Sequence, residues 1–131
     1  MVEINNLTRF KFDKKRLEKL AEKVLNGEKK NKVELSVVFV EQEEIRKLNK
    51  KYRKINRPTD VLSFGYKESG EVVICPENVK QNAEEYGETF KRELARVLIH
   101  GLLHILGYNH EQKESEAVKM EKKTNYYLKL L

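Results

Sequence analysis

The sequence contains only one cysteine, Cys75, and no apolar run long enough to cross a bilayer. The single cysteine excludes an internal disulfide and fits a reducing compartment. The polar start from Met1 to Asn6 does not resemble a signal peptide. We therefore expect a cytoplasmic protein without a membrane partner.

Internal repeats, low-complexity tracts and linkers are also missing from the 131 residues, so residues 1–131 are expected to form a single domain. Hydrophobic residues make up 39% and charged residues 37% of the chain, which is typical of a globular protein with a heavily charged surface. The formal net charge of +6 favours a polyanionic partner.

Part of the positive charge is concentrated in one segment. Residues 46–57 contain seven basic residues and no acidic one: Arg46, Lys47, Lys50, Lys51, Arg53, Lys54 and Arg57. Clustered charge of one sign is self-repelling, so we expect phosphate contacts here, although a solvated helix face would show a similar pattern. The candidate RNA-binding residues are Lys50, Lys51, Tyr52, Lys54 and Arg57. Tyr52 has two interpretations, a base-stacking residue or a packing residue.

All three histidines of the chain lie within eleven residues. His100 and His104 are four apart, so a helix would place both imidazoles on one face. Gly107 fits the position just after a helix, where the chain turns, and this turn would bring His110 back towards the other two. Three imidazoles with an open fourth position are typical of a catalytic zinc site. The alternative is a chance pair of histidines that are hydrogen-bonded within the core.

Hydrophobic periodicity and turn residues predict the elements around this segment. Strands are expected at 2–7, 33–40, 61–66 and 71–75, the last two as a hairpin. Helices are expected at 13–25, 41–51, 76–86, 90–106 and 111–131. The predicted fold class is α/β of the α+β type, in two or three layers, with a small mixed sheet, about five helices and a central metal-binding helix.

The spacing H-x3-H-x2-G-x2-H also occurs in metzincin proteases, where a glutamate follows the first histidine and acts as general base. Here that position is Gly101, which has no side chain. This difference argues against ordinary peptide hydrolysis.

Three segments resemble the YbeY family of bacterial endoribonucleases. Residues 100–110, HGLLHILGYNH, are similar to its HGxLHLxGYDH signature, with Asn109 where the family usually has aspartate. Asn49, Tyr52, Arg53 and residues 58–64 resemble N-x2-YR…PT(D/N)VLSF, after which Gly65 stands where proline is common. Residues 70–74 resemble its G(D/E)I-x-I strand.

The resemblance implies a metal-dependent endoribonuclease that matures the 3′ end of small-subunit ribosomal RNA, with the small ribosomal subunit as partner. We expect one Zn²⁺ bound by His100, His104, His110 and a water, with Arg53 meeting charge on the phosphoryl oxygens. The general base stays open among Asp60, Glu111 and Glu114. Cys75 is conceivable as a further ligand, although a small buried strand residue is the simpler interpretation.

Two other functions remain as alternatives at this point. One is a zinc hydrolase of another substrate, such as a metalloprotease. The other is a non-catalytic ribosome-assembly factor in which the metal is structural. The oligomeric state does not follow from the sequence.

Overall fold

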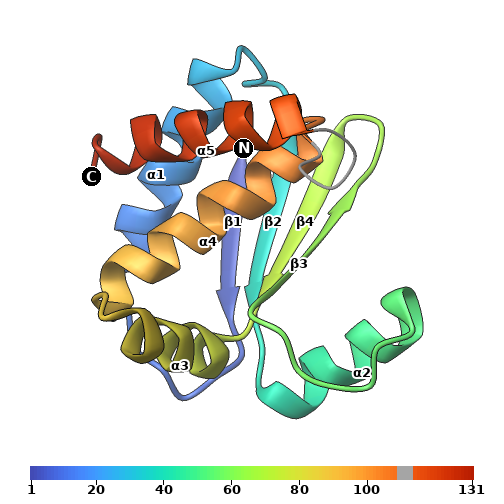
Figure 1. The fold of residues 1–131 in the computed structure, drawn as a ribbon. Coiled ribbons are helices and arrows are strands. Elements are labelled where there is room, and N and C mark those ends of the chain that lie inside the picture. Colours follow the sequence, from blue (N-terminus) through green and yellow to red (C-terminus); the bar gives the residue numbers. More distant parts are fainter. Residues whose placement is uncertain (109–113) are drawn as a thin grey trace.

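The computed structural model describes residues 1–108 and 114–131. Within these residues, four strands and five helices form one layer of sheet with helices packed on it (Figure 1). The strands are β1 (Val2–Asn6), β2 (Glu34–Phe39), β3 (Val61–Gly65) and β4 (Ser69–Ile74). The helices are α1 (Lys14–Gly27), α2 (Gln42–Arg53), α3 (Pro76–Tyr86), α4 (Phe90–Ile105) and α5 (Glu114–Leu128). The predicted α/β fold of the α+β type is confirmed.

The sheet is mixed, with strand order β1-β2-β4-β3. β1, β2 and β4 are parallel, whereas β3 pairs antiparallel with β4 and forms one edge. The predicted hairpin is therefore confirmed, but its turn was placed too late. Tyr66 N donates to Ser69 O at 2.9 Å, so Ser69 and Gly70 already belong to β4.

The main core lies on the face of the sheet covered by α1 and α4 (Figure 1). Alternate residues of β2, namely Leu35, Val37 and Phe39, point into this core, as the period of two in a strand requires. α4 is buried on most sides because α1, α3, α5, β3 and β4 all contact it. The predicted central helix is thus confirmed.

A smaller core lies on the opposite face of the sheet, beneath α2. Ile45 of α2 packs there with Val73 and Leu62, while Leu48 and Phe64 are partly buried against them. Strand residues that neighbour the main-core residues in sequence point to this opposite face, because successive residues of a strand alternate between the two faces of the sheet. This second core fixes α2, and the basic segment that continues from it, beside the β3 edge of the sheet.

Local sequence signals mark both ends of α4. Thr89 caps the helix, its Oγ1 accepting a hydrogen bond from Arg92 N at 3.1 Å. Gly107 follows the helix with φ = +107°, a conformation that favours glycine. Among the described residues, no helix is both long and apolar enough to cross a membrane.

Candidate active site

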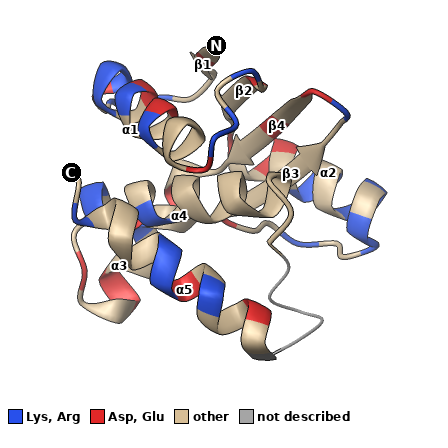
Figure 2. Cartoon of the chain, turned by 90° about the horizontal axis from the view of Figure 1, so that it is seen from above, with Lys and Arg blue, Asp and Glu red and all other residues tan. Residues whose placement is uncertain are grey.

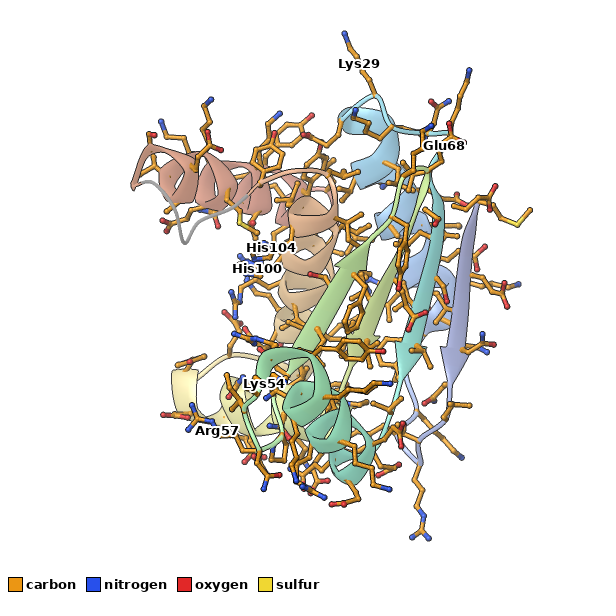
Figure 3. All side chains as sticks on the ribbon, turned by 90° about the vertical axis from the view of Figure 1, so that its right-hand side faces the viewer. Lys29, Lys54, Arg57, Glu68, His100 and His104 are labelled. Carbon is orange, nitrogen blue, oxygen red and sulfur yellow. The ribbon has the colours of Figure 1, made fainter. Side chains whose placement is uncertain are left out.

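The two described histidines lie in a cleft of about 840 Å³ between α4, β3 and the end of α2. Arg96, His100 and His104 line it from successive turns of α4, because residues four apart share a helix face. Figure 3 shows His100 and His104 on the same side of α4, with Lys54 and Arg57 on the neighbouring segment after α2. The cleft therefore faces both the histidine motif and the basic segment.

The histidine pair has a geometry that suits a shared metal ion. The Nε2 atoms of His100 and His104 are 3.2 Å apart. Two nitrogens bound to one tetrahedral zinc at 2.0–2.1 Å would be separated by about 3.3–3.4 Å. The same distance accommodates a hydrogen bond between one protonated and one unprotonated ring nitrogen. The donor atoms and their spacing fit the expected metal.

His110, Asn109 and Glu111 lie outside the described residues, as does the side chain of Glu114. Within residues 1–108 and 114–131, no cluster of three or more His, Cys, Asp or Glu side chains is positioned to hold a metal. The third ligand therefore stays a prediction.

Gly101, next to His100 in α4, lies on the side of the helix that packs against the sheet. A Cβ atom built on Gly101 would lie 3.0 Å from Val72 Cγ1 and 3.4 Å from Val61 Cγ2. Val72 is fully buried, so it has little room to move. The glutamate found at this position in the protease motif would have to enter this contact between helix and sheet. Close packing thus explains why a small residue stands there.

Arg53 lines the cleft together with Tyr52, both from the last turn of α2. Tyr52 is 55% exposed, and its ring meets Phe64 edge-on at 5.1 Å between ring centroids. Lys51 Nζ also lies over this ring, 5.2 Å from its centroid, so the tyrosine is packed on one side and partly exposed beside the cleft. The other candidate RNA-binding residues are exposed but do not line this cleft: Lys50, Lys51, Lys54 and Arg57.

Internal contacts fix the conformation of the basic segment. Lys54 ends α2 in the left-handed conformation (φ = +63°), and Asn49 Nδ2 donates to Arg57 O at 2.8 Å. Arg46 also donates hydrogen bonds to Glu43 and Asn56. These contacts hold the turn after α2 next to the cleft, so Arg53 is presented from a fixed segment.

Asp60 is the carboxylate that the structure places in the cleft. Asn82 Nδ2 donates to its Oδ2 at 3.3 Å, and Thr59 Oγ1 donates to its Oδ1 at 3.4 Å. Burial raises the pKa of Asp60 above its ordinary value, although backbone N–H groups and the charge of Arg96 act in the opposite direction. A raised pKa brings a carboxyl group closer to the range that suits proton transfer.

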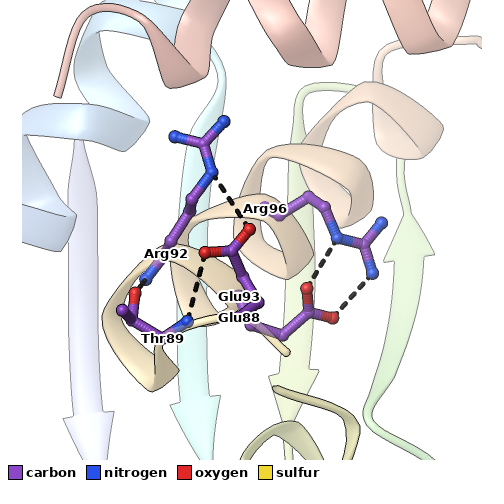
Figure 4. A network of polar contacts seen from close by, with 5 residues as sticks. All are labelled: Glu88, Thr89, Arg92, Glu93 and Arg96. Atoms are coloured by element: carbon purple, nitrogen blue, oxygen red, sulfur yellow. Dashed lines mark hydrogen bonds and ion pairs between the residues drawn. The ribbon is translucent and has the colours of Figure 1, made fainter. Parts of the chain in front are cut away.

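Arg96 adds a second guanidinium to the cleft. Its Nε and Nη2 donate to the two carboxylate oxygens of Glu93 at 2.8 and 2.7 Å (Figure 4). Glu93 is buried, and its hydrogen bonds raise the pKa of Arg96. The side chain of Arg96 remains 40% exposed, so this paired arginine has a fixed orientation and an open side towards the cleft.

The comparisons with known proteins agree with this arrangement. Residues 3–131 match the family model described as endoribonuclease YbeY. The chain belongs to that family. Endoribonuclease YbeY of Aquifex aeolicus is 42% identical over 132 residues, covering 95% of this chain and 88% of the relative. Endoribonuclease YbeY of Thermotoga maritima is 41% identical over 119 residues, covering 87% and 79%.

A solved structure supports the same assignment. The solution structure of a Thermotoga maritima protein superimposes on this chain with a TM-score of 0.75 at 35% identity. It covers 98% of this chain, and 87% of the solved chain is matched. The YbeY-family match includes the described histidines, Arg53 and the strands beneath them.

Of the residues that line this cleft, sequence reasoning singled out His100, His104 and Arg53 but missed Arg96. The signal was present in the sequence, because Arg96 precedes His100 by one helical turn, as His100 precedes His104.

Cys75 was correctly expected to be buried. It packs in the smaller core, its Sγ lies 3.6 Å from Asn78 Oδ1, and it does not line the cleft.

Proposed function

We propose that this protein is a zinc-dependent endoribonuclease that cuts single-stranded RNA, and that it matures the 3′ end of small-subunit ribosomal RNA as part of ribosome quality control. The observation that carries the proposal is one cleft containing two imidazoles at ligand spacing and two arginines. Family membership supports the class of reaction. The ribosomal substrate rests on the family resemblance and on the basic segment beside the cleft.

His100 and His104 would hold the metal, with His110 as the third ligand. Bound there, zinc would lower the pKa of a coordinated water and act as a Lewis acid. The helix fixes the relative position of the two described imidazoles, since both come from adjacent turns of the buried α4. Gly101 allows that helix to sit close to β4, which keeps the imidazoles at the wall of the cleft.

The arginines supply the positive charge that phosphodiester hydrolysis needs. Negative charge develops on the phosphoryl oxygens in the transition state, and a planar guanidinium can donate to two of them. Arg53 is exposed and lines the cleft, so it is placed to bind the scissile phosphate. Arg96 is already paired with Glu93 and has fewer free donors, so we assign it to orienting the phosphate backbone.

Two features disfavour the alternatives. A metalloprotease of this motif needs a glutamate base, and here that position is Gly101, which has no side chain and is packed tightly against Val72. A structural metal needs a closed set of four protein ligands, and the sulfur candidate Cys75 lies in the smaller core away from the cleft. Neither feature concerns RNA directly, so the substrate needs its own experiment.

A circular single-stranded RNA tests the proposed reaction because it has no ends for an exonuclease. We expect the zinc-loaded protein to convert it to a linear product of the same length and to leave a matched RNA duplex intact. An unstructured protein serves as the substrate for the protease alternative. If the circle stays intact while the unstructured protein is cut, the proposal is wrong. If both stay intact, the assembly-factor alternative is favoured.

The ribosomal substrate is tested with small-subunit RNA that carries a 3′ extension, supplied free and within precursor subunits. We expect cleavage near the mature 3′ end. Cleavage at scattered single-stranded sites in both forms would retain the ribonuclease and reject the specific maturation role.

A further inference from the structure

A second cleft, of about 740 Å³, adjoins the first. It lies between the end of α1, the end of α4 and α5. Gly107 and Tyr108 line both clefts, so the two clefts meet at the residues that directly follow α4. A bound chain that extends beyond the histidine cleft past these two residues would reach the second cleft.

One stripe of α5 forms a wall of this second cleft. Lys119, Lys122, Lys123 and Tyr126 all line it, at positions i, i+3, i+4 and i+7 of the helix. This spacing places the four side chains on one face. Figure 2 shows the successive lysine turns along α5. Lys30, just after α1, adds a fourth lysine from across the cleft.

The positive charge of the second cleft is only partly neutralised within the protein. The carboxylate of Glu28 accepts hydrogen bonds from Tyr108 OH at 2.7 Å and from Tyr127 OH, and it forms an ion pair with Lys123 Nζ at 3.3 Å. In the part of the chain that the structure describes, no carboxylate lies within 4 Å of the ammonium groups of Lys30, Lys119 or Lys122. Glu116 is the other acidic residue of the lining. Three lysines thus remain for an external anion.

Tyr126 provides an open aromatic surface beside these lysines. Tyr126 is 56% exposed, and its ring meets the ring of the buried Tyr127 edge-on at 5.0 Å between centroids. Tyr127 in turn is fixed by Glu28. A groove that combines lysines with an exposed aromatic ring suits single-stranded nucleic acid, whose phosphates bind the lysines and whose bases stack on the ring.

We propose that the α5 groove, formed by Lys30, Lys119, Lys122 and Tyr126, binds the part of the single-stranded RNA substrate that extends beyond the histidine cleft. The inference rests on the proposed ribonuclease function. It assigns substrate binding to a helix outside the basic segment of residues 46–57. RNA long enough to occupy both clefts should therefore bind more tightly than RNA that fills only the first.

The test compares single-stranded RNAs of about 4 and about 16 nucleotides in a binding titration at several salt concentrations. The variant is Lys119→Ala/Lys122→Ala, and the control is Lys15→Ala/Lys19→Ala. Lys15 and Lys19 are exposed on α1, so the control makes the same change in net charge away from both clefts. Alanine preserves helix propensity, so all proteins should remain folded, as circular dichroism will show.

We expect the variant to bind the longer RNA about tenfold more weakly than the control and to bind the shorter RNA equally well. The plot of the logarithm of the association constant against log salt should become less steep for the longer RNA. The magnitude of its slope should decrease by about 1.4, because two phosphate contacts to a single strand are lost. Tyr126→Ala should also weaken binding of the longer RNA, whereas Tyr126→Phe should retain it because the stacking ring remains.

Three results would overturn the inference, and they are distinguishable. If wild type binds and cuts the longer RNA but the variant equals the control, the groove is not used and the proposed function stands. If poly-glutamate competes as well as RNA does, and if Lys119→Ala/Lys122→Ala weakens its binding to the same extent, the groove binds any polyanion. If wild type neither binds nor cuts either RNA, the proposed function fails and the inference fails with it.

Discussion

Gly101 of α4 lies against Val72 of β4 so closely that an added methyl group would come within 3.0 Å of Val72 Cγ1. This contact joins the histidine-bearing helix to the sheet at the floor of the cleft. It also explains the departure from the metzincin pattern in physical terms. The position faces a packed contact rather than open space, and a longer side chain would separate helix and sheet.

Gly101→Ala is therefore expected to destabilise the protein despite the higher helix propensity of alanine. Overpacking costs about 1–3 kcal/mol, and the propensity gain offsets about 1 kcal/mol of it. We expect a net loss of about 1 kcal/mol in the free energy of unfolding, measured by denaturant titration. Gly101→Glu should lose several times more. An alanine variant more stable than wild type would show that the contact is loose.

Arg53 is predicted to act on the reaction and not on the fold. Arg53→Ala should lower kcat/KM for RNA cleavage by about 10²–10³, the usual effect of removing a group that stabilises transition-state charge. Arg53→Lys should restore only part, because an ammonium group lacks the planar pair of donors. The thermal midpoint and metal content should stay unchanged. Lys15→Ala, which removes an exposed positive charge on α1 outside the cleft lining, is the control.

A role for Arg53 confined to RNA binding gives a different pattern. Arg53→Ala would then raise KM without changing kcat, and salt would weaken binding less steeply. A variant that cleaves RNA as fast as wild type under all conditions contradicts both roles.

Glu28 should make stability depend on acid pH. Burial alone would raise the pKa of Glu28, but hydrogen bonds from Tyr127, Tyr108 and Lys123 together hold it below the ordinary value of 4.5. A lowered pKa contributes stability that is present above pH 4.5 and is lost as pH falls through the folded-state value. The same contact raises the pKa of Tyr108 to about 12, after the larger effect of burial.

Glu28→Gln is therefore expected to cost about 1–3 kcal/mol at pH 7, because charge-assisted hydrogen bonds are lost. The difference in the free energy of unfolding from wild type should shrink as pH falls below 4.5 and through the lowered folded-state pKa of Glu28. Denaturant titrations across this range give the measurement. Glu18→Gln, an exchange on α1 where no ion pair is found among the described residues, is the control. An equal difference between Glu28→Gln and wild type at pH 7 and pH 3 would contradict this account.

The sequence was sufficient for the parts of the fold that follow from local chemistry. Thr89 marks the start of α4, Gly107 turns the chain after it, and the i, i+4 spacing places His100 and His104 together. Resemblance to the YbeY family supplied Arg53, which lies far from the histidines in sequence but shares their cleft.

The missed features depend on contacts between distant segments. Nothing local distinguishes Glu28 from other surface glutamates, yet three partners from the end of α4 and from α5 converge on it. Gly101 was recognised as the absence of a base, whereas its packing against Val72 required knowledge of how α4 crosses the sheet. The lysines of α5 alternate with glutamates in the sequence, and only the fold shows that three of them line one cleft.

The central claim is that the three histidines bind the metal that makes the protein a ribonuclease. Elemental mass spectrometry on wild type and His104→Ala, both purified without chelators, tests it alongside cleavage of a single-stranded ribosomal RNA fragment. We predict close to one zinc ion per wild-type chain, with both zinc and cleavage lost in His104→Ala while the fold is retained. A wild-type protein that cleaves RNA without any bound metal, or a variant that keeps both its zinc and its activity, would contradict the claim.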